Sequence, residues 1–236
     1  MYKGKRIAAI IPARGGSKGI PNKNIVDLSG MPLIGHSITE ATKSSYIDKV
    51  IVSTDSVLIS EVALKYNAEV KGLRPAELSS DTAIIYDVLK YEIMNHKLEE
   101  DYDILILLQP TSPLRKSFMI DRAIERYVDE EQESAVSVSE VQEHPIFMRT
   151  IADGGKLNKV LDISSTVRRQ DLPKYYRVNG MIYINWISDL MKGYVSLNDN
   201  VYPIIIPPEY AVDIDTPEDL EEAKKRLEKY FAVIEE

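Results

Sequence analysis

A loop near the N-terminus gathers positive charge in a chain whose formal net charge is −8. Its sequence, residues 11–24, is IPARGGSKGIPNKN and contains no acidic residue. The side chains in it that can reach a bound anion are those of Arg14, Lys18, Lys23 and Asn24. An arginine offers phosphate oxygens a planar fork of donors, whereas a lysine acts as a point charge. Such a cluster in an acidic chain indicates a site for a small polyanion, and we expect a nucleotide triphosphate.

The glycines of the same loop are expected to help it hold phosphate. Gly15, Gly16 and Gly19 would allow positive φ angles and let backbone N–H groups approach an anion closely. The loop matches neither the GxxxxGK[ST] nor the GxGxxG phosphate-binding pattern. Taken alone it could equally be a solvated turn with ion-paired cations, but its position after an apolar run typical of a buried strand favours phosphate.

A second candidate site lies near the C-terminal end, in YAVDIDTPEDL. Residues i and i+2 of an extended segment point the same way, so Asp213 and Asp215 would present two carboxylates on one face. Two hard oxygen ligands with positions left for phosphate oxygens suit Mg²⁺. The alternative is that Asp215 assists a helix N-terminus while Asp213 is solvated. Opposite the cationic loop, the pair predicts the metal half of a nucleotidyl-transfer site.

A third loop, LLQPTSPLR, follows another apolar run and presents amide and hydroxyl groups. Pro110 and Pro113 stiffen it, and Gln109, Thr111 and Ser112 could hydrogen-bond a polyhydroxylated substrate. A proline-rich loop with local turns is the alternative without function. Ligands of open α/β sheets bind beyond the carboxyl ends of the strands, where all these loops fall, and so we expect one shared cleft.

The N-terminal loop also satisfies the G-x-S-x-G pattern of hydrolase nucleophiles, with Ser17 at its centre. That motif requires a helix directly after the turn and an earlier strand that supplies an oxyanion-hole amide. Here Pro21 and a polar NKN run follow the turn, and no strand precedes the first one. A serine hydrolase is therefore disfavoured.

The composition excludes several other classes of function. The chain has no cysteine, which rules out disulfides, thiolate catalysis and zinc–thiolate sites. Its three histidines are scattered along the sequence, which disfavours a His-rich metal site. No long stripe of lysine and arginine exists to neutralise a nucleic-acid backbone. The apolar run at residues 7–11 is too short for a signal sequence or a membrane span, so we expect a cytoplasmic protein.

Short apolar runs alternate with segments of helical periodicity. Strands are expected at residues 6–12, 49–54, 102–109, 134–141, 180–185 and 202–208. Helices are expected near residues 32–45, 56–67, 83–97, 117–132 and 217–232. Continuous hydrophobicity in the strands and strand–helix alternation predict a doubly wound α/β fold with a mostly parallel sheet.

Two further segments have a distinctive character. The last helix has a start signal, with Thr216 as N-cap, Pro217 as first helical residue and Asp219 as reciprocal partner at N3. The stretch 142–177 is polar, rich in mixed charge and without a helical period. We interpret it as an arm inserted into one domain that spans residues 1–236.

Six motifs, in order over almost the whole chain, resemble the acylneuraminate (CMP-sialic acid) cytidylyltransferase family. They are IPARGGSKGIPNKN, VSTD, LRPAELSSDTA, LLQPTSPLR, RRQDLPKYYRVNGMIYIN and VDIDTPEDL. The resemblance implies a Rossmann-like nucleotidyltransferase fold and a requirement for CTP and Mg²⁺. It also implies a homodimer with an exchanged dimerisation arm, to which residues 142–177 would correspond.

The resemblance also implies roles for individual residues. CTP would contact Arg14, Gly15, Lys18, Lys23, Asn24, Arg74 and Ser80, and the metal would bind Asp213 and Asp215. The sugar would contact Gln109, Thr111, Ser112, Asn179 and Tyr183. Arg169 would hold the sugar carboxylate, in its own subunit or across the dimer, unless it forms a surface ion pair with Asp162 or Asp171. Catalysis would fall to Arg14, Lys18, Lys23 and the two aspartates.

Two regions depart from the family pattern, and both would face the sugar. After HP, where some members carry a basic residue, this chain has Ile146, Phe147 and Met148. An aromatic pair found in some members is replaced near YVSLND, residues 194–199. The sugar is therefore left open among sialic, legionaminic, pseudaminic and 3-deoxy-manno-octulosonic acids. The last is ranked lower, because its enzymes typically have a different basic loop.

The function predicted from the sequence is activation of a nonulosonic, 2-keto-3-deoxy sugar acid by CTP, giving a CMP-sugar for cell-surface polysaccharide and pyrophosphate. Catalysis would come from in-line positioning and charge neutralisation, since no residue is an obvious general base. A non-catalytic nucleotide-binding module is the rival from another class, and it would need neither the aspartate pair nor the sugar loop.

Overall fold

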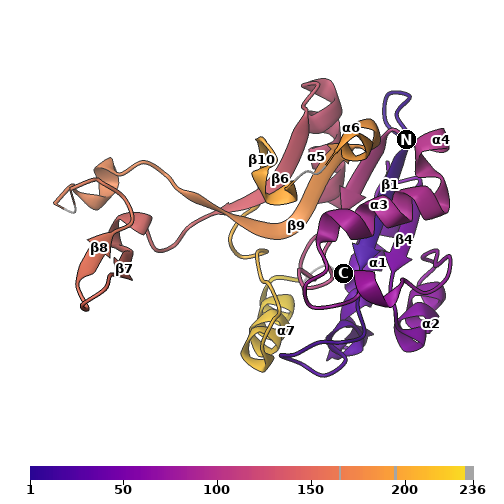
Figure 1. The fold of residues 1–236 in the computed structure, drawn as a ribbon, viewed down its shortest axis with the longest axis horizontal. Coiled ribbons are helices and arrows are strands. Elements are labelled where there is room, and N and C mark those ends of the chain that lie inside the picture. The colour runs from indigo at the N-terminus through magenta and orange to yellow at the C-terminus, as the bar shows by residue number, and fades with distance from the viewer. Residues whose placement is uncertain (165, 194–195, 232–236) are drawn as a thin grey trace.

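A six-stranded sheet forms the centre of the fold (Figure 1). The computed structural model describes residues 1–164, 166–193 and 196–231. Across the sheet the strands are, in order, β10 (Tyr202–Ile205), β6 (Ser134–Glu140), β9 (Tyr176–Trp186), β5 (Ile104–Leu107), β1 (Ile7–Pro12) and β4 (Lys49–Ser53). β9 runs antiparallel to β5 and β6, whereas the other paired strands are parallel. The sheet is thus mostly parallel, as predicted.

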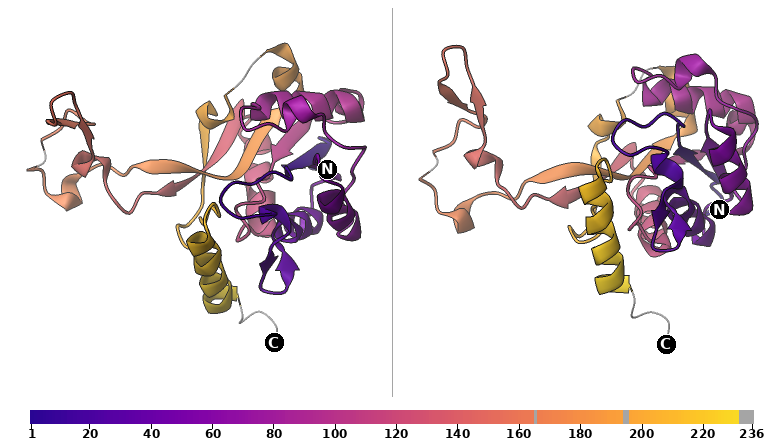
Figure 2. Two further views of the ribbon diagram at one scale, coloured as in Figure 1. Left: turned by 60° about the horizontal axis from the view of Figure 1, so that its bottom comes forward. Right: turned by 90° about the horizontal axis from the view of Figure 1, so that it is seen from below.

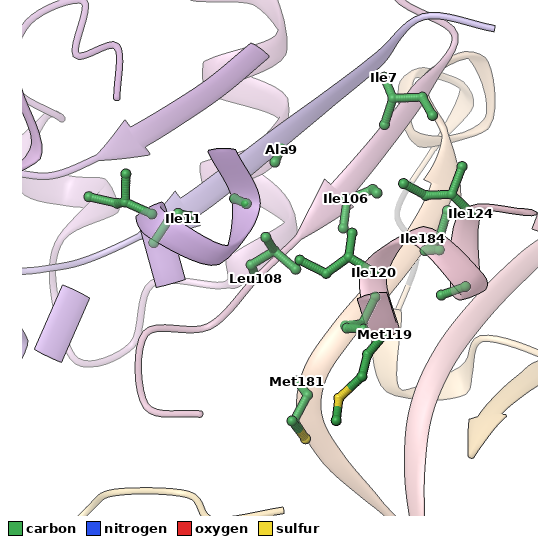
Figure 3. Close-up of a cluster of buried hydrophobic side chains, with 14 of the residues drawn as sticks. Ile7, Ala9, Ile11, Ile106, Leu108, Met119, Ile120, Ile124, Met181 and Ile184 are labelled. Atoms are coloured by element: carbon green, nitrogen blue, oxygen red, sulfur yellow. The ribbon is translucent and has the colours of Figure 1, made fainter. Parts of the chain in front are cut away.

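Helices pack on both faces of the sheet (Figure 2). One face is covered by α1 (Leu33–Lys43), α2 (Val57–Lys65) and α5 (Ser117–Asp129). The other is covered by α3 (Ile85–His96), α4 (Leu98–Asp101) and α6 (Ile187–Lys192). Because alternate strand residues point to opposite faces, Ile7, Ala9 and Ile11 of β1 join the first core, shown in Figure 3, while Ala8 and Ile10 join the second.

The remaining elements are short, apart from the last helix. β2 (Asp27–Leu28) and β3 (Met31–Pro32) form a small antiparallel pair, and single 3-10 turns occur at Lys23–Ile25, Ala76–Leu78 and Leu197–Asp199. α7 (Pro217–Phe231) packs through Leu220 and Ala223 against a third apolar cluster. Within the described ranges, no helix is both long and apolar enough to span a bilayer.

Every predicted strand and helix is found, in the predicted order and with the predicted type. The six apolar runs form the six strands of the central sheet, and the five helical segments form α1, α2, α3, α5 and α7. Residue 232, the predicted end of the last helix, lies outside the described residues. α4 and α6 were missed because they have only four and six residues, too few to show a helical period. β9 begins at Tyr176, earlier than predicted.

The predicted start of α7 is confirmed in detail. The Asp219 amide donates to the Thr216 Oγ1 at 3.3 Å, and the Thr216 amide donates to the Asp219 Oδ2 at 2.8 Å. This reciprocal pair is a capping box, which satisfies amides that the first helical turn leaves without partners. The Asp219 carboxylate also accepts from the amide of Asp215 at 3.0 Å, so the cap reaches back to the predicted metal aspartates.

The stretch after β6 leaves the body of the molecule as an extended arm (Figures 1 and 2). Long strands β6 and β9 lead to its base, and beyond them the arm carries a small hairpin of β7 (Arg149–Ile151) and β8 (Leu157–Lys159). Short 3-10 turns lie at Pro145–Phe147 and Arg169–Asp171. The irregular character predicted for 142–177 is therefore largely what is found, with the hairpin as an addition. Its role in dimerisation stays a prediction.

Candidate functional site

Two neighbouring cavities lie at the carboxyl ends of the central strands. The first, of about 460 Å³, opens beyond β1 and β5. It brings together most of the predicted nucleotide and metal residues, namely Arg14, Lys23, Asn24, Arg74, Ser80, Asp213 and Asp215, together with Gln109 and Thr111 of the predicted sugar loop. The second, of about 330 Å³, is lined by Arg177, Asn179, Tyr183 and Asn198, and shares Gln109 and Asp213 with the first. The expected shared cleft is thus present as two joined cavities.

The cationic loop is held in shape by hydrogen bonds from residues outside its tip. The buried Asn24 side chain donates through Nδ2 to the Arg14 carbonyl at 3.0 Å. The Gly15 amide donates to the Asp55 carboxylate at 2.8 Å, and Asp55 belongs to the STD run that follows β4. Asn24 therefore supports the loop from within, a role that the sequence did not indicate.

The positive φ angles expected for the glycines of the loop are not found, and the approach of their N–H groups to an anion stays a prediction. None of Gly15, Gly16 and Gly19 has a positive φ angle; in this loop only Asn22 does, at 52°. Gly19 is needed because of a close approach instead, since a Cβ built there would lie 2.1 Å from the backbone oxygen of Asp215. Side-chain-free backbone thus lets the cationic loop pack directly on the aspartate segment.

An acidic residue that sequence reasoning did not single out neutralises the loop. Asp81 accepts from Arg14 Nη1 at 2.7 Å and from Lys18 Nζ at 2.7 Å. The Lys18 hydrogen bond, together with that of Arg14, holds the pKa of Asp81 below its ordinary value even though desolvation opposes the shift. The position of Asp81 one residue after Ser80 in SSDTA was the available signal.

Asp215 contacts the cationic loop, and Asp213 lines the same cavity as cations of that loop. Lys23 Nζ donates to the Asp215 Oδ1 at 2.8 Å and to the Ile214 carbonyl at 2.9 Å. Asp213 faces both cavities, and desolvation by the surrounding protein raises its pKa, helped by the charge of Asp215 and opposed by a hydrogen bond from Thr111. The charge of Lys23 also opposes this rise in pKa, although no Lys or Arg of the described ranges forms a contact ion pair with Asp213.

The loop between the cavities is anchored by a buried arginine. Arg115, 1 % exposed, donates to the Gln109 carbonyl at 3.3 Å and to the Ser37 hydroxyl at 2.6 Å, and burial lowers its pKa to about 9. The backbone of Gly180 packs on the Gln109 side chain, because a Cβ there would lie 2.5 Å from the Gln109 Oε1. Arg115 was visible in LLQPTSPLR, but nothing in the motif showed that it would point inward.

Several predicted sugar contacts have other surroundings than expected. The Asn179 amide is engaged inside the sheet, because its Oδ1 accepts from Ser137 and its Nδ2 donates to Ser139. Ser112 is fully buried and lines neither cavity, although its hydroxyl has no hydrogen-bond partner among the described residues. Tyr183 lines the second cavity and donates to Asn198 at 3.1 Å.

Parts of the prediction fall on the arm or outside the described atoms. Arg169 lies in the 3-10 turn of the arm, and its side chain is not among the described ones. Residues 194 and 195, in the predicted YVSLND replacement, also lie outside the described residues. Lys18 is 78 % exposed at the outer side of the loop and does not line the first cavity.

The serine-hydrolase alternative receives no support from the local structure. Ser17 lies in irregular chain just before a bend at residues 18–20, and the next helical element is a single 3-10 turn at Lys23–Ile25. A nucleophile elbow requires a helix that begins immediately after the turn.

Comparisons with known proteins agree with this geometry. The sequence model of the family described as Cytidylyltransferase matches residues 8–235. The chain is 40% identical over 212 residues to an N-acylneuraminate cytidylyltransferase of Streptococcus agalactiae serotype V, covering 89% of this chain and 50% of that one. It therefore spans about half the length of this relative. It is 36% identical to a CMP-N,N'-diacetyllegionaminic acid synthase of Legionella pneumophila, with 94% and 97% coverage.

A solved structure shares the fold. It is a CMP:2-keto-3-deoxy-manno-octonic acid synthetase complexed with CTP, with a TM-score of 0.72 at 17% identity over 95% of this chain and 99% of that one. Because identity is so low, the match supports the fold alone, and it confirms the predicted nucleotidyltransferase architecture. The family model and the relatives confirm the resemblance drawn from the motifs: this chain belongs to the cytidylyltransferase family.

Proposed function

We propose that this chain transfers CMP from CTP to a nonulosonic sugar acid, releasing pyrophosphate. The observation that carries the proposal is the joining of a cationic loop and a pair of carboxylates in one cleft, where Lys23 and Asp215 lie 2.8 Å apart. A nucleotide-binding module without catalysis would need the cations but not the carboxylates. Membership of the family supports the reaction class, and the relatives named for N-acylneuraminate and diacetyllegionaminic acid support the substrate class.

In this scheme the triphosphate replaces Asp81 on the cationic loop. Arg14 would then donate to phosphate oxygens as a fork, while Lys18 and Lys23 would neutralise the charge that accumulates on the departing pyrophosphate. The Arg14 and Lys18 ion pairs with Asp81 are exposed and therefore weak, so replacing the carboxylate by the triphosphate would cost little free energy.

The second cavity would hold the sugar acid, with its reactive hydroxyl directed at the junction of the two cavities. There a new bond forms between the anomeric oxygen and the α-phosphorus, the bond from that phosphorus to the bridging oxygen of pyrophosphate breaks, and the hydroxyl proton passes to solvent. Gln109 and Asp213 border both cavities, and so they stand where the two substrates would meet. Catalysis rests on this positioning.

The residues at the junction fit a magnesium ion. Two carboxylates, one of them desolvated, suit an ion that takes one or two protein carboxylates and completes its shell with water and phosphate oxygens. No cluster of three or more His, Cys, Asp or Glu with metal-binding geometry occurs among the described residues, so the substrate would supply ligands. When bound, the ion would neutralise phosphate charge. Asp213 and Asp215 would hold it.

The sugar carboxylate needs a cation at the second cavity. Arg169 is the candidate by resemblance, in its own subunit or in a partner. Arg177 on β9 is the candidate by position, because it lines the second cavity and no hydrogen bond or ion pair ties its guanidinium to the described part of the chain. Legionaminic and pseudaminic acids share this carboxylate with sialic acid, so either residue would serve any of them.

The proposal also includes a cytoplasmic location and assembly into a homodimer. The arm exposes a run of apolar side chains at its tip, among them Phe147, Ile151 and Leu157 at 59%, 77% and 67% exposure. Apolar surface of this kind on an extended arm favours burial against a second copy of the chain.

A pyrophosphate-release screen tests the proposal. The protein is incubated with Mg²⁺, each nucleoside triphosphate in turn and a panel of nonulosonic acids. We expect release with CTP and at least one acid. Asp213→Ala and Asp215→Ala should each reduce turnover by more than about threefold, a loss above about 0.7 kcal/mol of transition-state stabilisation. CTP binding without pyrophosphate release with any acid would favour the non-catalytic module.

A further inference from the structure

A chain of buried polar groups leads from the nucleotide cleft into the core beneath it. Arg74 lines the cleft yet is only 6 % exposed, and behind it lie Ser53 and Glu92 at 1 % and 3 %. Arg74 Nη1 donates to the Ser53 hydroxyl at 3.4 Å, and that hydroxyl donates to the Glu92 Oε1 at 2.6 Å. Ser53 ends β4 and Glu92 lies on α3, so these hydrogen bonds connect the strand to the helix.

Neither Arg74 nor Glu92 forms a contact ion pair with an oppositely charged Lys, Arg, Asp or Glu side chain of the described residues. Within the described residues, Glu92 forms no ion pair with lysine or arginine, and its other oxygen lies 3.4 Å from the Nε2 of His96. Burial lowers the pKa of Arg74, whereas the charges of Asp55 and Glu92 raise it. Because an uncompensated buried charge is costly, the two charges stabilise each other through the serine between them.

The same contacts fix the direction of the guanidinium. Arg74 Nε donates to the Ser79 hydroxyl at 3.1 Å, and Arg74 Nη1 donates to the Ser53 hydroxyl. No described protein group accepts from Nη2, and this nitrogen is not among the buried atoms without a partner. Around Arg74 the cleft wall is apolar, formed in part by Leu78, Ala83 and Val88. A guanidinium edge beside an apolar wall suits a flat ring that has hydrogen-bond acceptors on its rim.

We propose that Glu92, acting through Ser53, is a positioning residue that presents Arg74 to the edge of the pyrimidine base and so favours cytosine over uracil. The inference rests on the proposed function only in taking CTP as the ligand. Cytosine carries acceptors at O2 and N3, which a guanidinium donor can satisfy, whereas uracil carries a hydrogen on N3 that faces the donor. Discrimination is strong where a buried polar group would otherwise be left unpaired.

Calorimetric titration with CTP and with UTP tests the inference, since binding requires no sugar acid. We expect Ser53→Ala and Glu92→Gln to reduce the ratio of the two association constants by about tenfold, equivalent to about 1.4 kcal/mol. The stoichiometry reports the folded fraction separately, so partial unfolding does not mimic the change. If Glu92→Gln fails to fold, Ser53→Ala carries the test.

Two controls separate positioning from general stabilisation. Glu69 accepts from His96 Nδ1 at 3.1 Å, on the side of His96 away from Arg74. Glu69→Gln therefore makes the same carboxylate-to-amide change as Glu92→Gln without touching Ser53 or Arg74, and it should leave the ratio unaltered. In an Arg74→Ala background, Glu92→Gln should have no further effect on the ratio. A ratio within about twofold of wild type in folded Ser53→Ala would overturn the inference. Failure to release pyrophosphate while the wild type prefers CTP would instead overturn the proposed function alone.

Discussion

Lys23 joins the two halves of the site at the scale of single residues. Its ammonium lies 2.8 Å from the carboxylate of Asp215, although 192 positions separate them in the chain. The lysine side chain is only 13% exposed, while that of Asp215 is 71% exposed. The cation is thus held by the protein, and the carboxylate remains open to a ligand from the cleft side.

Gly19 allows this approach, and replacing it should break it. In Gly19→Ala the new methyl group would meet the Asp215 carbonyl, so we expect a loss of about 1–3 kcal/mol in the free energy of unfolding and a fall in turnover of CTP. Chemical denaturation and pyrophosphate release measure the two effects. Gly16→Ala is the matched control, because no atom lies within 4 Å of a Cβ there, and it should change stability by less than about 0.5 kcal/mol. Equal losses in both variants would contradict the explanation.

Arg177 offers a test of how the sugar carboxylate is bound. Arg177→Ala should raise the KM for the sugar acid by about tenfold, as loss of a charge-assisted hydrogen bond does, while the KM for CTP stays unchanged. Steady-state kinetics with each substrate varied in turn separate the two constants.

The control for this prediction lies three residues away on the same segment. Lys174 is paired with Glu140 at 2.9 Å and is 68% exposed, so Lys174→Ala should leave both constants unaltered. A rise in the KM for CTP in Arg177→Ala, or no change for the sugar acid, would show that the residue does not bind the carboxylate.

At the scale of elements, the capping box of α7 positions the aspartate segment. Burial raises the pKa of Asp219, but hydrogen bonds from the amides of Asp215 and Thr216 outweigh it and hold the pKa below its ordinary value. For an acid whose pKa is lowered by folding, the stabilisation is present above the unfolded pKa, about 3.9, and is lost as pH falls through the folded value.

Melting curves across pH distinguish the two halves of the capping box. Thr216→Ala should reduce stability by about 1 kcal/mol at every pH, because the cap hydroxyl does not titrate. Asp219→Asn should reduce it by less than about 1 kcal/mol near neutral pH, since solvent screens the charge, and the difference from wild type should vanish below about pH 3. A deficit in Asp219→Asn that persists in acid would contradict a charge effect.

Strand β9 shows how one element serves both core and site. Its buried end completes the sheet between β5 and β6, and its exposed end carries Arg177 at the base of the arm. The antiparallel direction follows from the arm itself, because the chain leaves along β6 and returns along β9 without a crossover helix.

At the scale of the whole molecule, the arm is the feature that a single chain leaves unexplained. Ile151→Asp together with Leu157→Asp should convert the proposed dimer to a monomer, because charge cannot be buried at an apolar contact. Light scattering after size-exclusion chromatography measures the mass. The control is Leu64→Asp on α2, an exposed leucine of the body at 55%, which should keep the wild-type mass. A wild type that is already monomeric would remove the dimer from the proposal.

The elements and the loops of the candidate site could be read from the order of the residues alone. Apolar runs and helical periods are local properties, and burial on both sheet faces imposes them directly, so strands such as 6–12 and helices such as 117–132 could be predicted. The cationic loop, the pair of Asp213 and Asp215, and LLQPTSPLR could be predicted as segments of the candidate site because parallel strands bring their carboxyl ends to one edge.

Which side chains meet could be known only from the packed fold. That Asp81 neutralises Arg14, that Arg115 turns inward, that Asn179 is engaged inside the sheet and that Gly19 touches Asp215 all depend on contacts between distant segments. A motif gives residue types, but orientation follows from packing and from the need to pair every buried polar group. For the same reason, Glu92 became visible as a partner of Arg74 only once α3 and β4 were packed together.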